Sequence, residues 1–176
     1  MRTRHAILVM IGIAGAAPGG LEAQAVRRSQ RGTVSQTIAT TTITVIYNRP
    51  SARGRTLFGG VVRFGRVWNP GADEATTLTV SKDVRIAGQP LAAGKYSLWV
   101  IPAERGPWTL IFSRAANVFH VPYPQGQDAL RVSLEPERGA FMETLAFYFP
   151  VVEADSTVLR LHWGETVLPI PLAVTR

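Results

Sequence analysis

The sequence predicts an all-β protein, an antiparallel β-sandwich of about ten strands with little or no helix. Short runs of alternating apolar and polar residues recur along the chain, and turn residues separate them, with 16 Gly and 12 Pro among 176 residues. After residue 25, no window carries the apolar spacing of an amphipathic helix. A jelly-roll-like or barrel-like closure of the same strands is the alternative architecture.

The predicted strands follow one another at short intervals, bounded by Gly, Pro, Asn and Asp. They cover residues 34–38, 42–47, 61–64, 76–80, 84–86, 96–101, 108–112, 130–134, 143–149, 158–163 and 166–174. Residues 42–47 show the pattern most clearly, because Ile43, Val45 and Tyr47 alternate with polar residues and share one face.

A turn between two strands and two prolines in the last strand predict how these strands pair. Residues 96–101 and 108–112 are separated by a Pro- and Gly-containing turn and are predicted to form a hairpin. Pro169 and Pro171 stand two residues apart in the last strand. Proline cannot donate to a β-ladder, so we expect residues 166–174 to be an edge strand or a strand paired on one side only.

The first 25 residues have the layout of a cleavable secretory signal peptide. A basic start precedes the uncharged run 6–17, and a small-residue Ala-Gln-Ala pattern ends at Ala25, after which we predict cleavage. A helix of this run is about 18 Å long, too short for the ~30 Å hydrocarbon core, so no membrane span is expected after cleavage. Residues 26–32 then form a flexible N-terminus, and residues 33–176 form a single β-sandwich domain.

The composition excludes several classes of protein. The chain has no Cys, so disulfide scaffolds, thiolate nucleophiles, lipid-anchored forms and cysteine metal sites are ruled out. We therefore expect a free protein in the periplasm or outside the cell. The formal net charge is +7, but no nucleic-acid-binding motif is present, and the predicted compartment makes nucleic acid an improbable partner.

The segment 47–76 is a long, Arg-rich connection between two predicted strands. Long structured loops held by a rigid sheet often carry binding groups. The candidate ligand-binding residues are Arg49, Arg53, Arg55, Trp68, Asp73 and Glu74. Guanidinium groups suit phosphate, sulfate or carboxylate ligands, while Glu74, with Asp73 beside it, is the candidate general base.

Each of these candidates also has a structural interpretation. Glu74 is alternatively a buried carboxylate that holds the loop by pairing with Arg55 or Arg49. Trp68 is either a plug at one end of the sandwich or a stacking platform for a sugar. His120 and His162 have no metal-ligand spacing, and no serine lies in a nucleophile motif, so we expect neither a metal nor a cofactor.

Three stretches of the sequence are similar to a bacterial secreted family known as domain of unknown function 2911. They are Tyr47 to Gly60 (YNRPSARGRTLFGG), Val67 to Thr77 (VWNPGADEATT) and Leu91 to Phe112 with its LAAGKYSL and WTLIF segments. The resemblance covers most of residues 33–174. It implies a secreted all-β domain without assigned chemistry. Asn69 stands where the family pattern has Arg, and Asp73 stands where it has Asn.

Three functions remain open from the sequence. The first is a non-enzymatic binding module that takes a small polar or anionic ligand, a glycan or an envelope partner through the 47–76 region. The second is a hydrolase or isomerase with Glu74 as general base and an arginine as electrostatic clamp. The third is a structural protein of the envelope. The oligomeric state and the identity of the ligand are left open.

Overall fold

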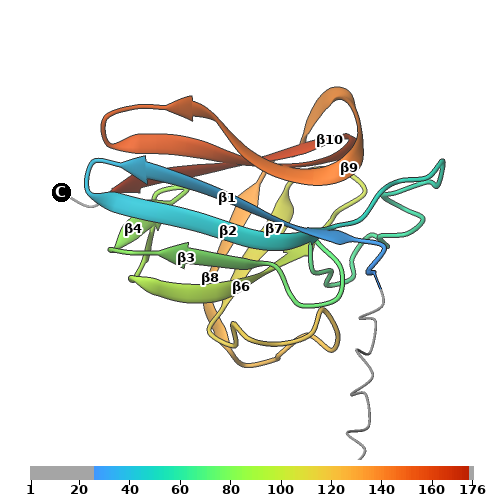
Figure 1. Ribbon diagram of the computed structural model, residues 1–176, viewed down its shortest axis with the longest axis horizontal. Coiled ribbons are helices and arrows are strands. Elements are labelled where there is room, and N and C mark those ends of the chain that lie inside the picture. Colours follow the sequence, from blue (N-terminus) through green and yellow to red (C-terminus); the bar gives the residue numbers. More distant parts are fainter. Residues whose placement is uncertain (1–25, 175–176) are drawn as a thin grey trace, which may run out of the picture.

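The computed structural model describes residues 26–174, which form two antiparallel sheets packed face to face (Figure 1). The described residues contain ten strands and no helix, which confirms the predicted all-β class. The sheets remain separate and do not close into a barrel. The predicted signal peptide, residues 1–25, lies outside the described residues.

The larger sheet has six strands in the order β1-β2-β3-β6-β7-β8. These are β1 (Gln30–Ile38), β2 (Thr41–Arg49), β3 (Thr77–Val80), β6 (Gly94–Ile101), β7 (Trp108–Ser113) and β8 (Asp128–Leu134). The predicted hairpin is confirmed, because β6 pairs with β7 and Val100 stands opposite Leu110. β1 begins at Gln30, so the last three residues of the segment 26–32 lie in a strand.

The smaller sheet has four strands in the order β5-β4-β10-β9, and β9 and β10 lie over β1 and β2 in Figure 1. These are β4 (Val84–Ile86), β5 (Gln89–Leu91), β9 (Glu137–Val152) and β10 (Ser156–Val174). β4 and β5 form a short hairpin that follows β3 and crosses to this sheet before the chain returns as β6.

Three strand predictions differ from the structure. The predicted strand 61–64 is a series of turns, because Gly59 and Gly65 flank it with positive φ angles of 87° and 71°. The predicted strands 158–163 and 166–174 form one strand, β10, whose register shifts around Gly164 at φ 60°. The short strand β5 was not predicted, since its three residues include a proline.

The prolines of β10 lie where its pairing changes sides. β10 pairs with β9 as far as Val167 and with β4 from Leu172 onward. β10 is therefore an interior strand of its sheet, and the prediction of an edge strand is wrong. The alternative prediction was a strand that pairs on one side only, and this is true of each half of β10. Pro169 and Pro171 lie between the half that pairs with β9 and the half that pairs with β4.

The main hydrophobic core lies between the two sheets. Alternate residues of β2, β6 and β7 point into it, as the sequence pattern predicts, and Ile43, Val45, Leu98 and Phe112 are fully buried there. The opposite, outer face of the six-stranded sheet carries a second, smaller cluster built on Trp99 and Ile111. This outer face is partly covered by the β7–β8 connection, residues 114–127.

Candidate functional site

The β2–β3 connection, residues 50–76, first closes one end of the sandwich. Its Leu57 and Val62 are buried in the main core. Trp68 stacks on Trp163 of β10 with ring centroids 6.0 Å apart and an interplanar angle of 14°, and Phe58 lies edge-on to Trp68 at 5.8 Å. Trp68 therefore packs as the plug that the sequence analysis weighed against a stacking platform.

After Trp68 the chain is fixed to β6 at two points, and a turn, residues 69–75, leaves the sheet between them. Trp68 exchanges two backbone hydrogen bonds with Val100, and the Leu98 amide donates to Thr76 at 2.8 Å. Buried Asn69 joins both ends of the turn. Its Nδ2 donates to the Leu98 carbonyl at 2.7 Å, and its Oδ1 accepts from the Thr76 amide at 3.2 Å.

The tip of this turn spans the gap between β2 and the β7–β8 connection. Asp73 has a φ of 58°, a left-handed conformation that Asn and Asp adopt more readily than most residues. The Asp73 carbonyl accepts a hydrogen bond from the His120 amide at 2.9 Å, and the Ala75 amide donates to the Val118 carbonyl at 2.9 Å. These contacts fix the position of Glu74, which lies between them.

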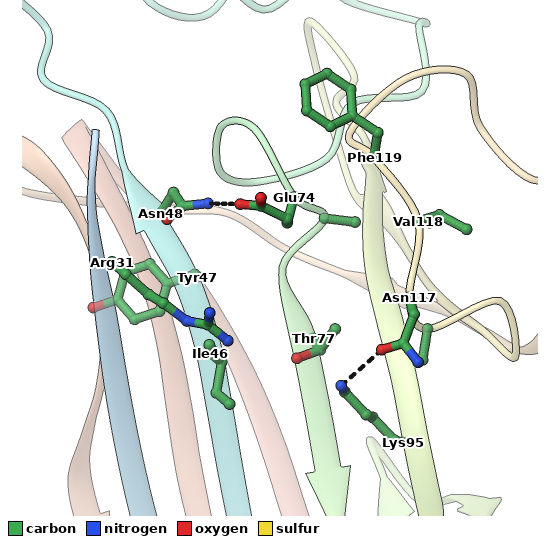
Figure 2. A pocket seen from close by; sticks show the side chains of 12 residues that line it. Arg31, Ile46, Tyr47, Asn48, Glu74, Thr77, Lys95, Asn117, Val118 and Phe119 are labelled. Atoms are coloured by element: carbon green, nitrogen blue, oxygen red, sulfur yellow. Dashed lines mark hydrogen bonds between the residues drawn. The ribbon is translucent and has the colours of Figure 1, made fainter. Parts of the chain in front are cut away.

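Glu74 lies above the outer face of the six-stranded sheet, at the rim of a pocket of about 260 Å³ (Figure 2). Asn48, at the end of β2, is only 5% exposed and donates from Nδ2 to Glu74 Oε2 at 3.0 Å and to the Ala72 carbonyl at 2.8 Å. A buried amide thus holds the carboxylate at the mouth of the pocket.

The pocket has a mixed lining contributed by four strands and two loops. The lining residues are Arg31, Ile46, Tyr47, Asn48, Glu74, Ala75, Thr77, Lys95, Ala116, Asn117, Val118 and Phe119. In Figure 2, Arg31 of β1 and Lys95 of β6 extend toward the pocket from opposite sides, with Ile46 and Thr77 between them. Lys95 Nζ donates to Asn117 Oδ1 at 2.9 Å.

A guanidinium from the N-terminal segment contacts the same carboxylate. Arg27 Nη1 donates to Glu74 Oε2 and lies 4.0 Å from Asp73 Oδ2. The hydrogen bonds from Arg27, the backbone and Asn48 lower the pKa of Glu74 to about 2. The Glu74 carboxylate is thus ionised at neutral pH, and it pairs with Arg27, not with Arg55 or Arg49, the partners considered in the sequence analysis.

The three arginines predicted for the site lie away from this pocket. Arg49 Nε donates to the Leu145 carbonyl of β9 at 3.2 Å. Arg55 donates to the carbonyls of Ala52 at 2.9 Å and Ser51 at 2.7 Å, within its own loop. Arg53 is exposed, and its backbone amide binds the Glu143 carboxylate at 2.7 Å. These arginines order the loop and its junction with β9.

Of the six candidate residues, the structure places Glu74 at the pocket and Asp73 beside it. Arg31, Asn48, Lys95, Asn117 and Phe119 line the pocket but were not predicted. Asn48 gave no distinct sequence signal, since a polar residue after Tyr47 continues the alternation of its strand. The others are brought together only by strand register and by the long β7–β8 connection.

One family model matches most of the chain. The model of the family described as "Protein of unknown function (DUF2911)" matches residues 29–172. The chain belongs to this family. The matched range includes β1 to β9, β10 except its last two residues, the 69–75 turn and all residues that line the pocket. No curated protein and no solved structure matches the chain.

Residues 26–174 lack two further features. These residues contain no group of three or more His, Asp or Glu side chains that could hold a metal ion. Nor do they form a helix of the length and hydropathy that a membrane span requires.

Proposed function

We propose that this protein is a non-enzymatic binding module that takes a small polar ligand with an anionic group in the pocket beneath Glu74. The observation that carries the proposal is a 260 Å³ pocket with two cationic side chains directed into it from different strands. A pocket of this kind, apolar at the floor and with a few polar groups at the walls, is typical of sites for small molecules.

The two basic side chains favour an anion. Arg31 is exposed, and its guanidinium has no hydrogen-bond partner among residues 26–174. Lys95 gives one hydrogen bond to Asn117 and keeps two N–H groups for a ligand. A carboxylate, a phosphate or an acidic sugar between them would form charge-assisted hydrogen bonds on both sides.

The electrostatics of Glu74 favour binding over general-base catalysis. A general base works best when its pKa is close to the working pH. The pKa of Glu74 is about 2 because Arg27, the backbone and Asn48 all stabilise the ionised form. The carboxylate is therefore a weak proton acceptor and a good hydrogen-bond acceptor, which suits the recognition of a donor group on a ligand.

A ligand screen with matched variants tests the binding proposal. The mature protein is screened by thermal shift against simple carboxylates, phosphates, acidic sugars and glycans. We expect at least one anionic compound to raise the melting temperature, and Arg31→Ala and Lys95→Ala to abolish the rise. Arg66→Ala is the control, since Arg66 is exposed and lies in the loop outside the pocket. A rise that persists in both pocket variants would contradict the proposal.

We also propose that the protein is exported to the periplasm or secreted, with residues 1–25 removed as a signal peptide. The basic start, uncharged run and Ala-Gln-Ala site support this. N-terminal sequencing of the protein from envelope and culture fractions should give a chain that begins at Val26. Recovery from the cytoplasm of a chain that retains residues 1–25 would contradict it.

A further inference from the structure

The N-terminal residues 26–30 lie beside the pocket, where they line a hollow of their own. Val26, Arg27, Ser29 and Gln30 line a second hollow of about 500 Å³. This hollow shares Arg31, Asn48 and Glu74 with the first pocket, so the two adjoin around these residues. The Arg27 guanidinium lies in this hollow against the Glu74 carboxylate.

Arg27 is held there by few contacts. The residues before Gln30 do not take part in the β1–β2 ladder. The backbone of Arg27 receives one side-chain hydrogen bond, from Gln30 Nε2 to its carbonyl at 2.6 Å. The side chains of Arg27 and Glu74 remain 54% and 55% exposed, and exposed ion pairs of this kind are weak. A soluble cation can therefore compete with Arg27.

The carboxylate, in contrast, keeps its position without Arg27. Asn48 binds Glu74 from below, and the backbone of its turn is fixed on both sides, to Val118 and His120. Asp73 adds a second negative charge, with its Oδ2 4.0 Å from Arg27 Nη1. At this distance the two groups attract each other electrostatically but do not form a hydrogen bond. The turn thus presents a preformed binding site for a cationic group.

We propose that Arg27 occupies the place of a ligand's cationic group, and that the ligand is a zwitterion with a guanidinium or primary ammonium beside an anionic group. This rests on the proposed function, because the anionic group would lie between Arg31 and Lys95. Figure 2 shows Glu74 at one end of the pocket and Lys95 at the other, so a carboxylate and an ammonium group stand at opposite ends. Basic amino acids and short peptides with a basic residue have the matching charges.

Titration calorimetry with paired probes tests this inference. The probes are L-arginine, L-citrulline, which has the same shape but an uncharged urea group, and succinate, which has only anionic groups. The mature protein should bind L-arginine at least about tenfold more tightly than L-citrulline, because a charged donor bonds a carboxylate more strongly than a neutral one. Glu74→Gln should remove this preference.

The variant Arg27→Ala provides the decisive comparison. This variant removes the guanidinium that contacts Glu74. It should bind L-arginine about threefold more tightly than the parent protein, the gain expected when a weak internal competitor is lost. Arg28→Ala is the matched control and should bind as the parent does, since Arg28 is exposed and has no partner among residues 26–174.

The outcomes separate this inference from the proposed function. Equal affinity for L-arginine and L-citrulline, or no gain from Arg27→Ala, overturns the inference. Succinate binding that depends on Arg31 and Lys95 would then leave the anion-binding proposal standing. If none of the three probes binds, the inference is likewise overturned, and the thermal-shift screen decides the proposed function on its own.

Discussion

The two faces of the six-stranded sheet are built from alternate residues of the same strands, yet they differ in what covers them. The inner face is mostly apolar, and Leu98, Leu110 and Phe112 are completely buried against the other sheet. On the outer face, Trp99 and Ile111 are covered by the β7–β8 connection, while Ile46 and Thr77 lie in a pocket beside it.

This difference places the core residues and the residues of the proposed binding pocket on opposite faces of one sheet. The inner face is sealed by a whole sheet, so it can contribute only to stability. The outer face is covered by one loop of limited width, so the sheet remains open next to the loop. The side chains at the boundary, such as Lys95, are held by the sheet and still reach solvent. Changes on the two faces should therefore have separable effects.

The largest effect is expected on the inner face. Phe112→Ala leaves a cavity in the main core and should lower the free energy of unfolding by about 4 kcal/mol. Denaturant unfolding followed by tryptophan fluorescence measures the loss. At temperatures where the variant is folded, its ligand affinity should equal that of the parent protein. A change in affinity without loss of stability would break the distinction between the faces.

A smaller loss is expected beneath the β7–β8 connection. Trp99 is buried, donates from Nε1 to Ser97 Oγ at 2.8 Å and lies edge-on to Tyr123 at 5.2 Å. Trp99→Phe removes this hydrogen bond and part of the ring contact, and should cost about 2 kcal/mol. Hydrogen exchange should show faster opening of residues 114–127, with little change in β7. Uniform acceleration across the sheet would contradict this prediction.

Asn48 joins the sheet to the turn, and its loss should affect both properties modestly. Asn48→Ala removes two donated hydrogen bonds, to Glu74 and to the Ala72 carbonyl, and should cost about 1 kcal/mol. It also removes the hydrogen bond that positions the Glu74 carboxylate. Ligand affinity should therefore fall although the Asn48 side chain is uncharged. Ser35→Ala, on the exposed part of the same face, is a control that should leave affinity unchanged.

The smallest effect is expected from the protonation of Glu74. Its pKa is about 2 in the folded protein, below its ordinary value of 4.5, because Arg27 stabilises the carboxylate. This contribution to stability is complete above about pH 4.5 and is lost as pH falls through 2. The difference in free energy of unfolding between the parent and Glu74→Gln should therefore shrink across that window.

The sequence predicts the fold well because alternation along a strand reports directly on burial. Ile43, Val45 and Tyr47 were assigned to one face, and all three are buried in the main core. The apolar pattern does not predict the structure where backbone conformation or strand pairing determines it. Residues 61–64 are apolar enough for a strand but lie between glycines in the left-handed region. Pro169 and Pro171 suggested an edge, yet β10 changes partners there and lies inside its sheet.

The pocket was only partly predictable, because its residues meet through long-range pairing. Glu74 was identified from its loop. Arg31 was not, because its position depends on the β1–β2 register that sets it opposite Asn48. Lys95 and Asn117 come together only where the β7–β8 connection folds back over β6. The arginines of the 47–76 segment were conspicuous in the sequence, but most of their hydrogen bonds are made to backbone carbonyls.

The position of β10 has a consequence for the order in which the molecule can be assembled. β10 follows every other strand along the chain, yet it stands between β9 and β4 in the four-stranded sheet. The part of β10 that joins β4 and β5 to β9 is therefore synthesised about 80 residues after β5. Until Val174 has been synthesised, the four-stranded sheet is incomplete, and the larger sheet would expose part of its apolar inner face if it folded first. We therefore expect the nascent chain to stay unfolded or to bind a chaperone until then.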